Sequence, residues 1–422
     1  MRRWPGFDAG ERANLRRVQL DFLPSWPPVW PSMVALGVLA FLSLALGEFA
    51  ARVLRLPRML GYLAAGALFG AGGQVLDGLQ IEGPPRRTLD LALDFATAFV
   101  LFDLGHRVSF GWLRRNPALI ASSLAESTAT FLLGFASLRW CGLATLPAAL
   151  LGAVSIATSP AIVLSITREL RTQGQVTERT LLLTALNCIY AIVVSTLMLA
   201  WAHLQYRGTL GAYVLQPLYL VIGSAVLAAV AARILVAVLA TAVERDRGAQ
   251  IMTMLALVAI VFGVAQALRL SHLLTLLACG AFVHMFDRRR RLAGTEFGVM
   301  SSFVLVLFFA LSAATADFDA TTLAWGPALV LVAVRIACKV GGVAAFARLS
   351  GVRTRQGIWN GVALAPMSTL ALLLARQVGL ADAKLGAQMQ SVLVVAVVVL
   401  QVGGALALTR ALRATGEARG TP

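Results

Sequence analysis

Charged side chains are scarce in this chain of 422 residues. They make up only 13% of it, against roughly a quarter in an ordinary soluble domain, whereas hydrophobic residues reach 59%. This balance excludes a soluble globular enzyme, a disordered protein and a disulfide-stapled secreted module. A membrane core about 30 Å thick needs about 20 apolar residues per helix, and the chain offers one such segment after another. The sequence therefore predicts an all-α polytopic membrane protein.

Metal-binding, redox and catalytic patterns are also missing. The four cysteines and four histidines are scattered, without a C-x-x-C pair or metal-ligand spacing, so we expect no metal and no cofactor. The sequence has no nucleophile–base set and no phosphate loop, which favours a transporter over an enzyme. The basic excess, 36 Lys and Arg against 20 Asp and Glu, lies between apolar segments. We therefore attribute it to membrane topology and expect no nucleic acid partner.

Thirteen apolar segments are bounded by proline, glycine, arginine or short polar clusters. They cover about 31–51, 59–78, 88–105, 117–138, 148–167, 178–202, 214–241, 249–268, 271–286, 297–315, 323–347, 357–376 and 389–411. Loop arginines are concentrated after the odd-numbered segments, which predicts that these loops and the carboxyl terminus are cytoplasmic. The five arginines that precede the first segment favour the opposite orientation.

The thirteen segments divide naturally around the seventh. We expect a transmembrane domain over 31–411, preceded by an interfacial lead-in over 1–30 and followed by a short tail over 412–422. Within the domain, the division predicts a first repeat over about 31–202, a linker helix over about 214–241 and a second repeat over about 249–411.

Two segments are interrupted by proline at their middle. The fifth reads "LGAVSIATSPAIVLSITREL" with Pro160, and the twelfth reads "IWNGVALAPMSTLALLLA" with Pro366. A mid-helix proline frees a backbone carbonyl, and in lipid such groups persist only beside protein or water. Broken helices at matching positions of two halves point to a transporter binding site. The alternative is that these are two ordinary proline kinks, in which each proline only bends a continuous helix.

Several ionisable residues fall deep inside the apolar segments, where charges are costly and are functional candidates. They are Asp94, Glu126, Arg233, Arg335 and Lys339. Arg335 and Lys339 are four residues apart and share one helical face, so they require an anionic partner, water or a neutral lysine. Desolvation and a neighbouring cation both favour the neutral amine. The candidate proton carriers are therefore Lys339, Asp94 and Glu126.

A structural lysine, held by broken-helix carbonyls or by one of these carboxylates, is the alternative. Two further acidic residues, Glu48 and Asp103, lie near segment ends, where we expect them to reach an interface.

Several motifs occur in the order found in bacterial cation:proton antiporters. "LPRMLGYLAAGALFG" resembles L-P-x-x-L-G-Y-L-x-x-G, and "ATSPAIVLSITREL" resembles the broken-helix motif S-T-x-A-I-V-L-x-x-x-x-E-L. "CKVGGVAAFARLSG" resembles G-K-x-x-G followed by A-x-x-x-G. Over nearly its whole membrane region the chain resembles the monovalent cation:proton antiporter-2 family of sodium/proton and potassium-efflux exchangers. The resemblance implies a thirteen-helix inverted-repeat antiporter of the bacterial inner membrane with crossed broken helices. It also implies a homodimer in which a core bundle moves against a dimerisation bundle and exchanges protons for sodium or potassium.

The ion-binding carboxylate of that family is missing. The family's acidic pair aligns with Asn187-Cys188, whereas the lysine that partners it is retained as Lys339. A thiol is a poor ligand for a hard cation, so neutral oxygens and broken-helix carbonyls would complete an altered site. The residues expected at this site are Asn187, Cys188, Lys339, Thr158, Ser159, Arg335, Ser368 and Thr369.

Three functions remain open at this point. The first is a cation:proton antiporter with the altered site. The second is a same-fold transporter of another substrate, because two helix amino-terminal dipoles with Arg335 and Lys339 favour an anion. The third is a transport-inactive sensor or partner subunit. Exchange requires a titratable group whose protonation competes with the substrate, so pH dependence separates the first from the others.

Overall fold

The computed structural model describes residues 30–72, 83–108, 110–206, 210–241, 247–287, 298–315 and 324–419. Within these ranges the chain is helical apart from its connections and one isolated β-bridge. This confirms the all-α prediction. The expected lead-in over 1–30 lies, except for Trp30, outside the described residues.

Every expected segment coincides with a helix or with a pair of half-helices. The helices are α2 (Ser32–Arg52), α3 (Arg58–Ala71), α5 (Arg86–His106), α6 (Phe110–Arg115), α7 (Pro117–Trp140), α8 (Thr145–Ser155), α9 (Pro160–Glu169), α10 (Gln175–Tyr206), α11 (Leu210–Thr241), α12 (Arg247–Ala267), α13 (His272–Phe286), α14 (Gly298–Ala314), α15 (Trp325–Ala345), α16 (Thr354–Ala363), α17 (Leu370–Ala381) and α18 (Ala383–Ala414). Seven helices of the described part are long and apolar enough to cross a membrane. The membrane character is thus confirmed, and the number of thirteen crossings stays a prediction.

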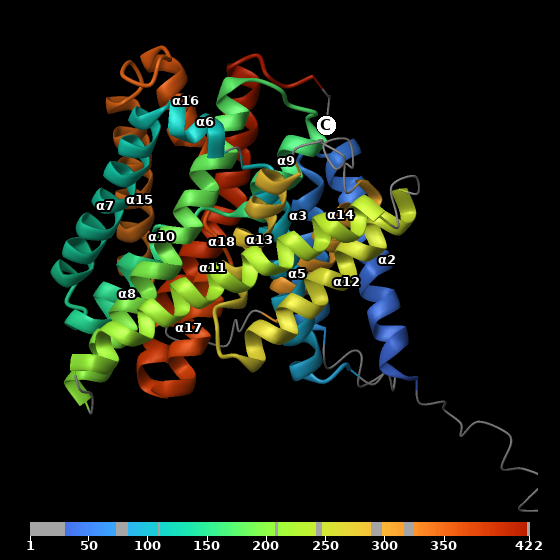
Figure 1. The fold of residues 1–422 in the computed structure, drawn as a ribbon, viewed down its shortest axis with the longest axis horizontal. Coiled ribbons are helices and arrows are strands. Elements are labelled where there is room, and N and C mark those ends of the chain that lie inside the picture. The colour runs from blue at the N-terminus through green and yellow to red at the C-terminus, as the bar shows by residue number, and fades with distance from the viewer. Residues whose placement is uncertain are drawn as a thin grey trace, which may run out of the picture.

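The helices pack into two groups (Figure 1). The first, which we call the core group, consists of α7 to α10 and α15 to α18 and contains both pairs of half-helices. The second, the panel group, consists of α2, α3, α5 and α11 to α14. The groups meet where α9 and α10 lie against α5, where α9 lies against α14, and where α10 lies against α11.

Glycines bring three helices of the core group unusually close together. A Cβ atom at Gly342 of α15 would lie 2.5 Å from the Cβ atom of Glu126 on α7. A Cβ atom at Gly361 of α16 would lie 2.6 Å from the Cα atom of Val340 on α15. Because these positions carry no side chain, α7 and α16 both lie directly against α15. This packing sets how closely Glu126 approaches the polar face of α15.

We predict that Gly342→Ala destabilises the protein whereas Gly341→Ala does not. A Cβ atom at Gly341 meets nothing within 4 Å, and alanine favours a helix over glycine by about 1 kcal/mol. At Gly342 the added methyl forces α7 away, which costs about 1–3 kcal/mol. Thermal unfolding in detergent, followed by tryptophan fluorescence, measures the difference. Equal melting temperatures for the two variants would contradict this packing.

Candidate functional site

The two broken helices cross at their breaks. The first break, residues 156–159, separates α8 from α9, and the second, residues 364–369, separates α16 from α17. Thr158 and Met367 form an isolated antiparallel bridge, and the amide of Ser159 donates to the carbonyl of Pro366 at 3.1 Å. Both breaks are buried. The predicted crossing is confirmed, and the alternative of two ordinary proline kinks is wrong, because each helix ends before the crossing and a new one begins after it.

One guanidinium joins the two breaks. Arg335 of α15 is completely buried and donates only to backbone carbonyls. The acceptors are Ser155 (2.8 Å), Ala157 (2.9 Å), Leu364 (3.4 Å), Ala365 (2.6 Å) and Pro366 (3.2 Å). The carboxyl ends of α8 and α16 carry the negative ends of two helix dipoles. Arg335 therefore compensates both dipoles at once.

Lys339 lies one turn farther along α15 and binds a carboxylate. Its Nζ atom lies 2.7 Å from Oε2 of Glu126 on α7 and donates to the carbonyl of Ile156 in the first break at 2.9 Å. Neither side chain of the pair has any exposed surface. The other carboxylate oxygen, Oε1, has no hydrogen-bond partner among the described residues. The predicted shared face of Arg335 and Lys339 is confirmed, since both reach the first break.

Helix α10 contributes a chain of polar contacts to the same break. Asn187 donates from Nδ2 to Oγ1 of Thr158 at 3.2 Å and accepts at Oδ1 from the hydroxyl of Ser127 at 3.1 Å. Cys188 is buried, and its thiol donates to the carbonyl of Thr158 at 3.3 Å. Ser127 was missed by the sequence analysis. Its position next to Glu126 is the one signal that points to it.

The remaining predicted residues lie at the amino ends of α9 and α17. The Ser159 hydroxyl accepts from the amide of Ile162 at 3.4 Å, and the Ser368 hydroxyl accepts from the amide of Leu370 at 3.1 Å. Thr369 is buried, and its hydroxyl has no hydrogen-bond partner in the described part of the chain. Ser159 thus caps the amino end of α9, and Ser368, which precedes the first residue of α17 by two positions, occupies one amide of that helix; both take up donors that an anion would use.

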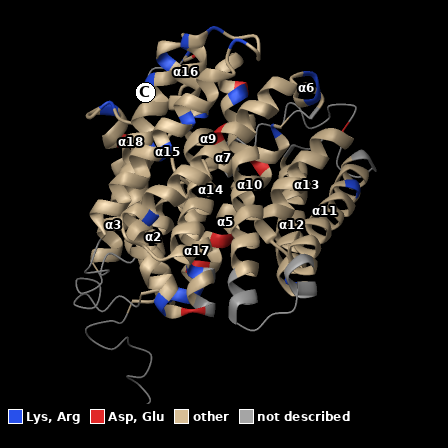
Figure 2. Cartoon of the chain, turned by 90° about the vertical axis from the view of Figure 1, so that its left-hand side faces the viewer, with Lys and Arg blue, Asp and Glu red and all other residues tan. Residues whose placement is uncertain are grey.

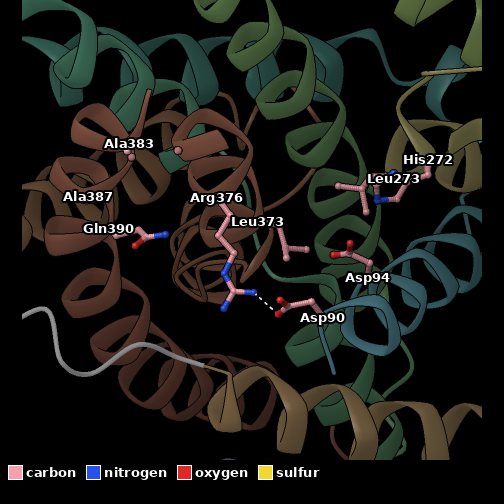
Figure 3. Close-up of a pocket in the computed structure, with 11 residues that line it drawn as sticks. Asp90, Asp94, His272, Leu273, Leu373, Arg376, Ala383, Ala387 and Gln390 are labelled. Atoms are coloured by element: carbon pink, nitrogen blue, oxygen red, sulfur yellow. Dashed lines mark hydrogen bonds and ion pairs between the residues drawn. The ribbon is translucent and has the colours of Figure 1, made fainter. Parts of the chain in front are cut away.

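Asp94, on α5, lies apart from the Lys339–Glu126 pair. It lines a cavity of about 490 Å³ beside α5 and α17, together with Asp90, His272 and Arg376 (Figure 3). Its charged neighbours are Asp90 and Arg376, whereas those of Lys339 are Glu126 and Arg335. Of the three candidate proton carriers, the structure therefore brings Lys339 and Glu126 together and separates them from Asp94.

Comparisons with known proteins point to one family. The family model described as "Sodium/hydrogen exchanger, transmembrane" matches residues 37–414. Two solved structures of the sodium proton antiporter MjNhaP1 from Methanocaldococcus jannaschii are similar to this chain, both at 16% sequence identity. The one at pH 8 has a TM-score of 0.66 and the match covers 92% of this chain and 99% of that one. The electron-microscopy structure has a TM-score of 0.71, with 91% and 98% covered. No curated protein sequence matches. At this identity the two structures establish the fold.

We predict that Arg335→Met abolishes folding. It leaves buried carbonyls of both breaks without a donor, and each such group costs about 1–3 kcal/mol. Arg335→Lys retains the charge, but an ammonium has no planar fork and cannot reach both breaks, so we expect a folded protein with a lower melting temperature. Size-exclusion profiles and thermal unfolding in detergent measure both effects.

The matched control is Arg233→Met, which removes an exposed arginine from α11. A well-folded Arg335→Met variant with a melting temperature like that of the control would show that the guanidinium does not hold the crossing together.

Proposed function

The chain belongs to the transmembrane sodium/hydrogen exchanger family, and we propose that it is a cation:proton antiporter in which Glu126 replaces the carboxylate missing at Cys188. The substrates are protons and a monovalent cation, sodium or potassium. Membership of this family places the chain among membrane transporters. The observation that carries the proposal is the fully buried pair of Lys339 and Glu126, 2.7 Å apart beside the crossing.

A buried ion pair provides the coupling that exchange requires. Removing one partner of such a pair leaves an uncompensated charge, which costs about 3–5 kcal/mol. A cation that binds the Glu126 carboxylate takes the place of the Lys339 ammonium. The displaced ammonium then lies near Arg335 without a counter-charge, which favours loss of its proton. Cation binding and proton binding at this pair therefore exclude each other.

The surroundings of Glu126 offer the ligands that a dehydrated cation prefers. Its Oε1 atom has no hydrogen-bond partner among the residues that the structure describes. Hard oxygens lie around the same break: the hydroxyl and carbonyl of Thr158, which hold Asn187 and Cys188, and the carbonyl of Ile156, which binds Lys339. Sodium and potassium bind oxygens of this kind, with at least one carboxylate to balance the charge. We assign the cation to this position.

The same contacts weigh against the other two functions. An anion carrier needs uncompensated positive charge, but Glu126 neutralises Lys339 and backbone carbonyls surround Arg335. A transport-inactive subunit needs only stability, and a buried ion pair is a poor stabilising device compared with apolar side chains of the same volume. The geometry favours exchange over both.

We also propose in which membrane the protein lies and how it is oriented there. Lysines and arginines gather toward the two ends of the helices, and the middle of the bundle carries few charges (Figure 2). Together with the arginine-rich odd-numbered loops, this supports a bacterial inner-membrane protein whose carboxyl terminus is cytoplasmic. The two repeats around a linker helix, the homodimer and the antiporter-2 subgroup belong to the same proposal.

We predict that Glu126→Gln and Lys339→Ala abolish cation-driven proton movement. The assay uses purified protein in proteoliposomes, with a lumenal pH dye that follows pulses of sodium, potassium, lithium or chloride. The wild type responds to sodium or potassium. Each variant loses the response by about 100-fold, the equivalent of roughly 3 kcal/mol for a broken buried pair. The matched control Glu48→Gln, which removes an exposed carboxylate paired with Arg52, responds like the wild type.

Two outcomes would overturn the proposal. One is a Glu126→Gln variant that still exchanges at the wild-type rate. The other is a silent wild type beside an active Cys188→Asp variant, which would mean that the fold is intact and that Glu126 does not replace the missing aspartate.

A further inference from the structure

Helix α5 of the panel group is held at both ends by arginines from the two broken helices. Arg168, near the end of α9, binds Asp103 of α5 and the hydroxyl of Ser301 on α14. Asp103 is 1% exposed, so the prediction that it reaches an interface is wrong, because α9 and α14 cover it. A second arginine makes corresponding contacts at the other end of α5.

Arg376 of α17 lies 2.6 Å from Asp90 of α5 and donates to the carbonyl of Thr315, directly after α14, at 2.7 Å. Asp90 and Asp103 are 13 residues apart, about 20 Å along a helix that rises 1.5 Å per residue. The second half of each broken helix is therefore tied to the same two panel helices, at opposite ends (Figure 1).

The two ends of α5 differ in how far water reaches the ion pairs there. Asp90 and Arg376 lie in the cavity of about 490 Å³, with their side chains 46% and 32% exposed. Figure 3 shows this pair at the edge of the cavity, with Asp94 farther along α5. At the other end, a cavity of only about 10 Å³ lies at the end of α9, lined by Arg55, Pro57, Ile166, Glu169, Leu170, Thr409 and Arg413. Because Arg168 and Asp103 are 22% and 1% exposed, we call the Arg168 end the closed end and the Arg376 end the open end.

We propose that Arg168 and Arg376 are gating residues whose ion pairs close, in turn, the two opposite ends of the contact between the core group and the panel group. The proposal rests on the proposed exchange function, because only a transporter needs alternating openings. A pair of charges attracts several times more strongly when protein replaces the surrounding water. Each pair therefore strengthens as its own end closes and weakens as that end hydrates. Movement of the core group along α5 and α14 exchanges the closed end for the open one.

The two ion pairs stabilise different conformations of the protein. In the conformation of this structure the Arg168–Asp103 pair, whose carboxylate is buried, keeps its end shut, so breaking it favours opening there. The Arg376–Asp90 pair is hydrated here and acts when the cavity closes. Breaking this second pair favours the conformation already seen. The two pairs therefore have opposite effects on the same equilibrium.

Cysteine labelling tests this without any need for transport. The reporters are Gln390→Cys in the open cavity and Thr409→Cys at the closed end. Both are placed in a Cys141→Ser background, because the other three native cysteines are buried. Purified protein in detergent is mixed with a membrane-impermeant maleimide, and the labelling rate of each reporter is measured. We expect the Gln390→Cys reporter to label at least tenfold faster than the Thr409→Cys reporter.

Asp103→Asn and Arg168→Gln both break the closed-end pair, and Asp103→Asn also removes the ion pair of Asp103 with Arg107, 3.3 Å away. Each should accelerate labelling of the Thr409→Cys reporter about tenfold and slow that of the Gln390→Cys reporter. Asp90→Asn, which breaks the pair at the open end, should not slow labelling of the Gln390→Cys reporter. It should also leave labelling of the Thr409→Cys reporter slow. The matched control is Arg233→Gln, which removes an arginine of α11 that lies over the ring of Phe286 inside the panel group and should leave both rates unchanged.

Unchanged labelling in both closed-end variants would overturn the gate, even if the wild type exchanges cations for protons. Shifted labelling together with a wild type that is silent in proteoliposomes would support the gate and count against the proposed exchange. The two failures are therefore distinguishable.

Discussion

One guanidinium, that of Arg335, is buried among five backbone carbonyl oxygens and fixes the crossing of the two broken helices. Two broken helices leave polar backbone groups in an apolar interior, where each unsatisfied group is costly. Arg335 satisfies carbonyls of both breaks because its planar fork presents several donors in fixed directions. Once it holds the crossing, Lys339 lies one turn away and reaches the carbonyl of Ile156. The position of the functional lysine thus follows from the requirement to stabilise the breaks.

Gly342 of α15 brings a carboxylate to this lysine. Gly342 carries no side chain where Glu126 packs against it, and this close approach brings the carboxylate of α7 to Lys339. In the proposed exchange this carboxylate takes the place of the one that the resemblance to antiporters leads us to expect at Asn187-Cys188. Cys188 then has only a neutral function, donating its thiol to a carbonyl of the first break. The site keeps one carboxylate and one ammonium, which is the minimum for competition between a cation and a proton.

Local patterns were predictable from the sequence, and contacts between distant segments were not. Proline in an apolar run marks a break, and a spacing of four residues puts Arg335 and Lys339 on one face, since both depend only on helix geometry. The partner of Lys339 was left open among Asp94, Glu126 and the breaks, because hydropathy gives membrane depth but not which helices touch. Asp103 shows the same limit: its place near a segment end does not reveal that Arg168 lies beside it.

Exchange through Glu126 requires that each bound cation displace a proton from the protein. Purified wild-type protein in weakly buffered detergent solution is titrated with sodium and with potassium while a pH electrode records released protons. Choline chloride serves as the ionic-strength control. We expect about one proton to be released for each cation bound, and none from the Glu126→Gln variant. Cation binding without proton release, or equal release from the Glu126→Gln variant, would contradict exchange through Glu126.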